Sequence, residues 1–286
     1  MAVRTEGELR ALVALLADED YRMAQLVIQA LLEAGTAALP FIEAAREHPD
    51  SRVRGRARAL LEEFRLRDLQ RRFTAFGSHT EGAQDLLEGA LLVSEYANPE
   101  QDPAEIRRQI DDMAEAARER VDGLTPLEAL RAFNRYFFVA KGFRAGDKAD
   151  LDNHFIGRLL DRRTGIPISL SVLYVLTGTR AGLPVSGVSF PQQFICRWDG
   201  AAQPLFIDPY GGGQILDEGD CIRYLATQGG GYHPDLLRPA SVRRTVARML
   251  DSLVILYGQR DERRRADLLK RFREAVLPRE EGHRDE

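Results

Sequence analysis

Residues 166–182 form an apolar segment of helix length, and two extended stretches follow it directly. In residues 183–199 apolar and polar side chains alternate, as expected of a half-buried strand. Residues 203–213 give a second extended stretch that stops at a proline and three glycines, and Asp199-Gly200 between the two favours an antiparallel hairpin. Helices followed by clustered antiparallel strands are typical of an α+β fold, here a mostly α one, and not of a parallel α/β sheet.

Residues 1–73 read as helices only, and they contain a short internal repeat. Asp18 and Asp50 each stand three residues before a large apolar or aromatic residue, Tyr21 and Val53, near the start of an apolar helix. Because Asp is a favoured N-cap, we expect each Asp to cap its helix and both following side chains to pack inward. The pattern resembles the helix-pair repeat of HEAT proteins, with an unrelated helical hairpin as the alternative.

The rest of the chain divides into two predicted parts. Residues 80–235 hold further helical stretches and the extended segments, and we expect them to form the central domain. Residues 241–277 are helical again and are predicted to be a C-terminal extension.

Composition excludes some partners. The net charge of -4 gives no general attraction to nucleic acid or to an anionic membrane, and we expect neither as a partner. No uninterrupted apolar run approaches the roughly 18 residues of a membrane span, and the first ten residues are too charged for a signal peptide. Two cysteines make no disulfide framework and indicate a reducing cytoplasm. The five histidines do not cluster, so we expect no metal and no cofactor.

Four motifs in the central domain carry a family resemblance over about residues 80–225. In order and spacing they resemble the transglutaminase-like core of the bacterial SirB-type family. This resemblance implies a papain-like core in which helices pack on a small antiparallel sheet. The motifs are Arg163-Thr164-Gly165-Ile166-Pro167-Ile168-Ser169, Gly182-Leu183-Pro184, Phe190-Pro191-Gln192-Gln193-Phe194 and Ile207-Asp208-Pro209-Tyr210.

The resemblance also implies a catalytic triad, and this sequence departs from it. The superfamily places a cysteine at the start of the buried helix, where the helix dipole stabilises the thiolate, with a histidine and an aspartate on the strands that follow. The matching positions are Pro167, Gln193 and Asp208. Proline has no nucleophile, and a glutamine amide cannot shuttle a proton near neutral pH. We therefore predict a pseudoenzyme that keeps the frame of the site and acts as a protein- or peptide-binding or scaffold module.

Two alternatives stay open. An enzyme with relocated chemistry would use Cys221, a serine or His154, and a purely structural assembly module would have no cleft. Asp208 itself fits either an orienting role or a plain turn before Pro209. Ser169 fits a hydrogen-bonding role at the helix start, and Cys196 fits a buried core thiol. The residues predicted to line a binding cleft are Asn153, His154, Ser169, Gln192, Gln193, Asp208 and Tyr210.

Overall fold

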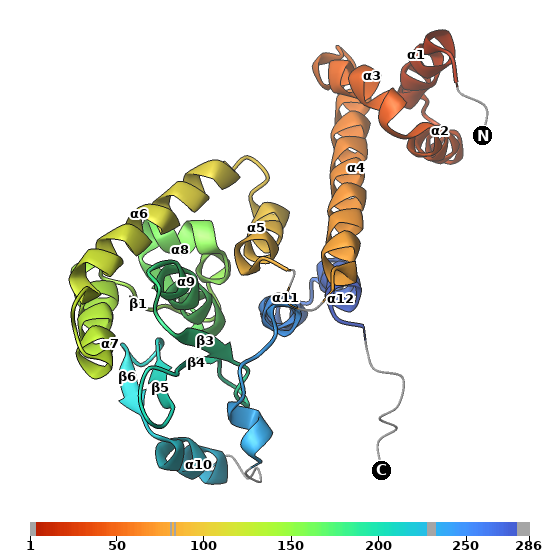
Figure 1. Ribbon diagram of the computed structural model, residues 1–286. Helices are drawn as coiled ribbons and strands as arrows, with labels where there is room; N and C mark the ends of the chain where they lie inside the picture. The colour runs from red at the N-terminus through yellow and green to blue at the C-terminus, as the bar shows by residue number, and fades with distance from the viewer. Residues whose placement is uncertain (1–3, 81, 83, 228–232, 279–286) are drawn as a thin grey trace. The chain divides into compact units, whose positions relative to one another are not determined.

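The computed structural model describes residues 4–80, 82, 84–227 and 233–278 of the chain (Figure 1). Backbone contacts divide the chain into two compact units, residues 1–71 and 72–286. Within the predicted central domain, residues 228–232 lie outside the described residues. The mostly helical α+β class predicted from the sequence is confirmed.

The described part of the first unit is helical throughout and has its own hydrophobic core. Leu16, Leu31, Ile42 and Val53, from four different elements, are fully buried in that core. The elements are α1 (Glu6–Ala14), η1 (Leu15–Ala17), α2 (Tyr21–Ala34), η2 (Gly35–Ala38), α3 (Leu39–Ala44), η3 (Ala45–Glu47) and α4 (Ser51–Ser78), which continues past residue 71.

One half of the predicted Asp pattern is right. Asp50 caps α4, because its Oδ1 accepts a 2.7 Å hydrogen bond from the Arg52 backbone N–H. Val53 then falls on the third helical position and is fully buried.

The other half is wrong. The cap of α2 is Asp20, whose Oδ1 accepts from the Arg22 N–H at 2.8 Å, and Asp18 instead accepts from the Asp20 N–H. Tyr21 is therefore the first residue of its helix, whereas Val53 is the third of its own. Relative to the start of the helix, the Tyr21 side chain points about 200° away from the direction that Val53 takes. Tyr21 is 72% exposed as a result.

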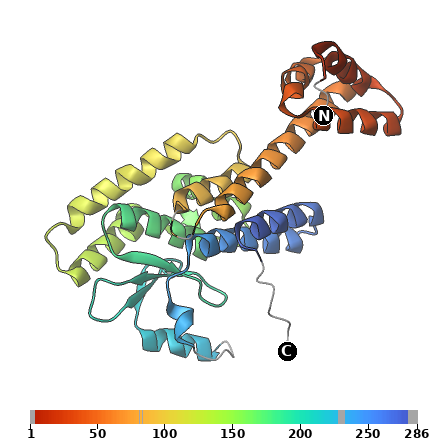
Figure 2. The ribbon, with the colours of Figure 1, turned by 45° about the vertical axis from the view of Figure 1, so that its right-hand side comes forward.

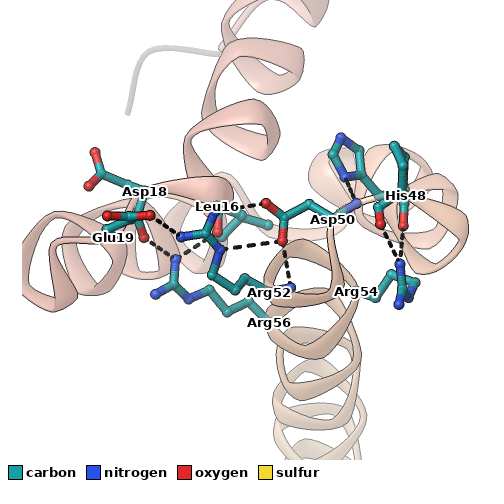
Figure 3. Close-up of polar contacts among 9 residues, drawn as sticks. Leu16, Asp18, Glu19, His48, Asp50, Arg52, Arg54 and Arg56 are labelled. Carbon is teal, nitrogen blue, oxygen red and sulfur yellow. Dashed lines mark hydrogen bonds and ion pairs between the residues drawn. The ribbon is translucent and has the colours of Figure 1, made fainter.

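Two arginines of α4 bond the connection between α1 and α2 within this unit, as Figure 3 shows. The Arg56 guanidinium donates to the carbonyl oxygens of Leu16 and Asp18, both at 2.7 Å. Arg52 pairs with Glu19 at 2.9 Å. The two Arg56 bonds satisfy carbonyls at and just after the short η1 turn, where the helix ends.

Among the described residues, Tyr21–Glu47 is long and apolar enough to cross a membrane by those two criteria. The structure does not fold it as one helix. Gly35, with a φ of +68°, interrupts it between α2 and η2, and Leu31 and Ile42 on either side enter the core of the first unit. Core helices of soluble proteins and signal sequences near an N-terminus pass the same test.

The second unit holds the remaining helices. Figures 1 and 2 show α9 between α6 and the sheet, with α10 beyond the sheet's other face. The helical elements are α5 (Leu86–Ala97), α6 (Pro103–Val121), α7 (Pro126–Asn134), the π-helical η4 (Arg135–Ala140), η5 (Leu151–His154), α8 (Ile156–Arg162), α9 (Pro167–Arg180), α10 (Glu218–Thr227), η6 (Pro234–Leu237), α11 (Val242–Gln259) and α12 (Arg263–Val276).

Four antiparallel strands form the main sheet in the order β3-β4-β5-β6. The hairpin predicted at Asp199-Gly200 joins β4 to β5, with Cys196 opposite Ile207. The single strand predicted over 183–199 is wrong: that stretch makes two strands, because a turn at Pro191 and Gln192 reverses the chain. The strands are β3 (Val185–Val188), β4 (Ile195–Trp198), β5 (Leu205–Asp208) and β6 (Gln214–Leu216); β1 (Arg144–Ala145) and β2 (Thr164–Gly165) form a separate parallel pair.

The two faces of the sheet bury different residues, as strand alternation requires. Ile195 and Phe206 pack with Leu225 of α10 in one cluster. Cys196 turns to the opposite face, where its thiol contacts the Ser171 carbonyl of α9 at 3.7 Å. Helix α9 is buried on all sides over Pro167–Gly178, so the start of this helix has a fixed position.

Candidate functional site

Pro167 occupies the first position of α9, and its missing N–H costs nothing there. Ser169, two residues later, is fully buried and holds the helix start. Its hydroxyl accepts from the Ile166 N–H at 3.0 Å and donates to the Asn153 carbonyl at 2.6 Å. Ser169 therefore has the hydrogen-bonding role at the helix start that its position predicts.

Asn153 is also buried and serves the framework. Its amide donates to the Asp147 carbonyl at 2.8 Å and accepts from the Thr164 hydroxyl at 2.8 Å. Gly146 lies against the same amide, so closely that a Cβ at this glycine would meet the Asn153 nitrogen at 2.6 Å. Asn153 thereby links the loop before η5, at Asp147, to the segment that precedes α9, at Thr164.

Gln193 follows a tight turn that ends just before β4. The backbone of Gln192 is left-handed, with a φ of +59°, and the Gln193 N–H donates to the Phe190 carbonyl at 3.1 Å. A left-handed backbone is strained for a residue with a Cβ and unstrained for glycine.

Replacing Gln192 with glycine is expected to stabilise the second unit by about 1 kcal/mol, because glycine adopts a left-handed backbone without the steric cost of a side chain. Urea unfolding followed through the fluorescence of Trp198, the single tryptophan, measures the change. The same substitution at the exposed Gln203 serves as the control, since the φ of Gln203 is not positive. A Gln192→Gly variant less stable than that control would contradict the prediction.

Asp208 acts as a turn residue. Its Oδ1 accepts from the Tyr210 backbone N–H at 2.9 Å, and no hydrogen bond joins it to Gln193 within the described residues. The Tyr210 hydroxyl donates to the Gly146 carbonyl at 3.0 Å. Of the two sequence readings of Asp208, the turn is the one whose contacts are present.

A pocket of about 210 Å³ is lined by both Pro167 and Gln193. Of the residues predicted for a cleft, it is lined by His154, Gln192 and Gln193; Asn153, Ser169, Asp208 and Tyr210 do not line it. One wall comes from α11, which offers one helical face at intervals of three and four residues. The lining residues are Lys148, His154, Ile166, Pro167, Ile168, Gln192, Gln193, Phe194, Arg248, Ser252, Ile255, Leu256 and Gln259.

The pocket is positively charged. It contains two cations, Lys148 and Arg248, and no acidic residue among its described lining. The Arg248 Nε is buried and has no hydrogen-bond partner among the described residues. The Lys148 ammonium lies 5.1 Å from the centre of the Tyr210 ring, which places Tyr210 behind the pocket.

His154 is buried between two partners. Its Nε2 lies 3.0 Å from the Lys148 carbonyl and its Nδ1 lies 3.0 Å from the Ser252 hydroxyl. Burial lowers the pKa of His154, so the imidazole is neutral at pH 7. A neutral ring that donates its proton from Nε2 to the Lys148 carbonyl can only accept a hydrogen bond at Nδ1, here from the Ser252 hydroxyl. The same hydroxyl also lies 2.7 Å from the Met249 carbonyl, so its single proton is shared between two acceptors.

Neither cysteine has the environment of a nucleophile. Cys196 is fully buried, and burial raises its pKa far above the ordinary value. Cys221 stands in the first turn of α10, but burial and the neighbouring Asp220 raise its pKa to about 12. The buried-thiol interpretation of Cys196 is right, and the residue lies in β4 with its side chain fully buried.

Sequence reasoning missed the residues of the pocket that lie outside the family motifs. Lys148 stands in a polar connector, and the five others belong to the segment predicted to be a separate extension. The residues of α11 that line the pocket recur at helical intervals in the sequence, but their neighbours in the sequence do not indicate which surface they pack against. The missed residues are Lys148, Arg248, Ser252, Ile255, Leu256 and Gln259.

Comparison with known proteins agrees with this core. A sequence model of the family described as "Transglutaminase-like superfamily" matches residues 104–251, more than half of the chain. The chain therefore belongs to the transglutaminase-like superfamily. No solved structure matches it.

Relatives occur in bacteria and in animals. The chain is 31% identical to a UPF0162 protein of Xylella fastidiosa, in an alignment covering 63% of this chain and 68% of the relative. It is 35% identical to a UPF0162 protein of Vibrio cholerae over 46% of the chain and 50% of the relative. It is 28% identical to human F-box only protein 21 over 72% of the chain, but over only 37% of that protein.

Proposed function

We propose that this protein uses its transglutaminase-like cleft to bind a protein or peptide and does not carry out thiol catalysis. The observation that carries the proposal is the pocket itself: Pro167 and Gln193, at the nucleophile and base positions, line one open cavity that has no thiol among its described lining residues. A retained cavity with convergent polar groups and an apolar wall is what a binding site requires. It also speaks against a structural module without a cleft.

Both cysteines are free thiols, which supports a reducing compartment such as the cytoplasm for this binding role. The HEAT-like interpretation of residues 1–73 adds a second interaction surface to the proposal, since stacked helix pairs commonly bind partners.

Affinity capture tests the proposal directly. Full-length protein bearing Gln193→Trp, which fills the pocket, is compared in a native lysate with wild type and with Gln203→Trp, a bulky change at an exposed turn. We expect at least one partner that wild type and the control retain and the Gln193 variant loses. Partners bound equally by all three would place binding elsewhere.

Alkylation tests the thiol-enzyme alternative. Raising the pKa of Cys221 from 9 to about 12 lowers its thiolate fraction at neutral pH roughly a thousandfold, and Cys196 is more deeply buried. In the folded protein, iodoacetamide at pH 7.5 is therefore expected to modify both residues at least a hundredfold more slowly than in 6 M guanidinium, where both should react fully. Mass spectrometry of the peptides gives the rates, and one fast thiol in the folded protein would restore the alternative.

A second candidate function, hydrolysis by a relocated serine, rests on the 3.0 Å contact between His154 Nδ1 and the Ser252 hydroxyl in the same pocket. A neutral histidine held by a backbone carbonyl is a suitable general base. Competition from the Met249 carbonyl for the same hydroxyl proton weakens this candidate. A fluorophosphonate probe decides it: labelling that Ser252→Ala removes would establish a serine nucleophile, and an unlabelled protein would exclude one.

A further inference from the structure

We propose that the pocket beside Pro167 recognises a peptide carboxylate, which Arg248 and Lys148 bind while an apolar side chain of the same peptide packs against the wall. This inference rests on the proposed binding function and names the chemistry of its ligand.

The first observation is the state of Arg248. Some other arginines of the second unit make ion pairs, as Arg162 does with Asp150 and Arg180 with Asp111. Arg248 has no carboxylate within ion-pair distance among the described residues, and its Nε is buried without an acceptor. A guanidinium has five hydrogen-bond donors and loses its hydration when it is buried. An acceptor from a bound ligand would therefore satisfy donors that have no partner in the chain. The planar fork of donors matches a carboxylate in particular.

The second observation is that the rest of the pocket adds positive potential. The Lys148 ammonium lies over the Tyr210 ring and makes no ion pair within the described residues. No Asp or Glu is among the described residues that line the cavity. The N-terminal end of α9, a helix of 14 residues, reaches the pocket at Ile166, Pro167 and Ile168. This end of a helix carries a partial positive charge that favours an anion.

The third observation selects a peptide over a small inorganic anion. Ile166, Ile168, Phe194 and Leu256 give the cavity an apolar wall, and Ile255 at its rim is 56% exposed. A volume of about 210 Å³ is below the range of most small-molecule sites, so a single residue suits it better than a large ligand. The amides of Gln192, Gln193 and Gln259 offer both donors and acceptors for a peptide backbone.

Two kinds of residue could supply the carboxylate, the C-terminal residue of a chain or an internal Asp or Glu. A test therefore uses full-length protein and three immobilised libraries of random hexapeptides: free C-terminal acids without Asp or Glu, the same sequences as C-terminal amides, and amides containing one Asp or Glu. We expect the wild type to enrich one of the two carboxylate-bearing libraries at least tenfold over the neutral amides. The library that is enriched identifies the source of the carboxylate. Equal retention of all three libraries, or no retention, would overturn the inference.

Matched variants assign the effect to the pocket. Arg248→Met keeps the length of the side chain and removes the charge, and we expect it to abolish at least nine-tenths of the enrichment, with Lys148→Met reducing it less. Arg244→Met, an exposed arginine on the same helix outside the pocket, is expected to leave the enrichment unchanged. Circular dichroism and the Trp198 unfolding curve confirm that each variant is folded. Undiminished enrichment by folded Arg248→Met would overturn the role of Arg248.

Inorganic phosphate at 10 mM, added at constant ionic strength, supplies the last comparison. We expect it to displace little of the bound peptide, because phosphate gains nothing from the apolar wall. Complete displacement would show a general anion site and overturn the inference. The proposed function can fail separately: if Gln193→Trp removes a captured partner while the libraries show no preference for carboxylates, the cleft binds its partner by other chemistry.

Discussion

Replacing Pro167 with cysteine is expected to create a thiol that iodoacetamide alkylates at pH 7.5 at least roughly a hundredfold faster than Cys196 or Cys221. The new side chain would stand at the first position of α9, in the field of the helix N-terminus, and would face a pocket that contains Arg248 and Lys148. Both influences favour a thiolate over a thiol. The natural cysteines have the opposite environment, since burial raises the pKa of each.

The measurement is the alkylation rate as a function of pH, followed by mass spectrometry. Gln203→Cys places a thiol in an exposed turn and supplies the pKa of an ordinary cysteine. We expect the midpoint of the Pro167→Cys profile to lie below that of the control. A midpoint at or above the control would show that the site no longer stabilises an anion, which would also count against a carboxylate ligand.

Asn153→Ala is expected to lower the free energy of unfolding of the second unit by about 2–4 kcal/mol. The substitution removes two buried hydrogen bonds and leaves the Asp147 carbonyl and the Thr164 hydroxyl without those partners. It also opens a gap beside Gly146, which packs directly on the amide.

Urea unfolding monitored at Trp198 reports on this unit, because the tryptophan is buried in β4. Gln203→Ala, at an exposed position, is the control and is expected to change the stability by less than about 0.5 kcal/mol. A loss below 1 kcal/mol in Asn153→Ala would mean that the loop before η5 is held by other contacts.

The start of α9 could be predicted because its signals are local. A proline at the first helical position and a hydroxyl two residues later favour a helix N-terminus, and the structure places both in those roles. The turn between β3 and β4 was missed although two signals mark it: Pro191 lacks an N–H for a strand, and the polar pair Gln192-Gln193 breaks the alternation. The left-handed backbone of Gln192 could not be read from its residue type, as it could from a glycine.

Only part of the pocket lining could be predicted from the sequence, for a different reason. His154, Gln192 and Gln193 lie in or beside segments that resemble the family, so the resemblance points to them. Arg248 and the α11 residues that follow it lie about 80 residues or more along the chain from Pro167, and their contact with the site arises only when α11 packs beside α9 and η5. A helical period shows that a face exists, but not which neighbour covers it.

The position of α11 also bears on how the protein can be divided. The family match ends at residue 251, one residue before Ser252, so a fragment cut at that limit would lose Ser252, Ile255, Leu256 and Gln259 together. It would keep Pro167 and Gln193 but expose the apolar surface that α11 now covers. A negative binding result from such a fragment would reflect the missing wall, and only a chain that includes the whole of α11 presents the cleft to a ligand.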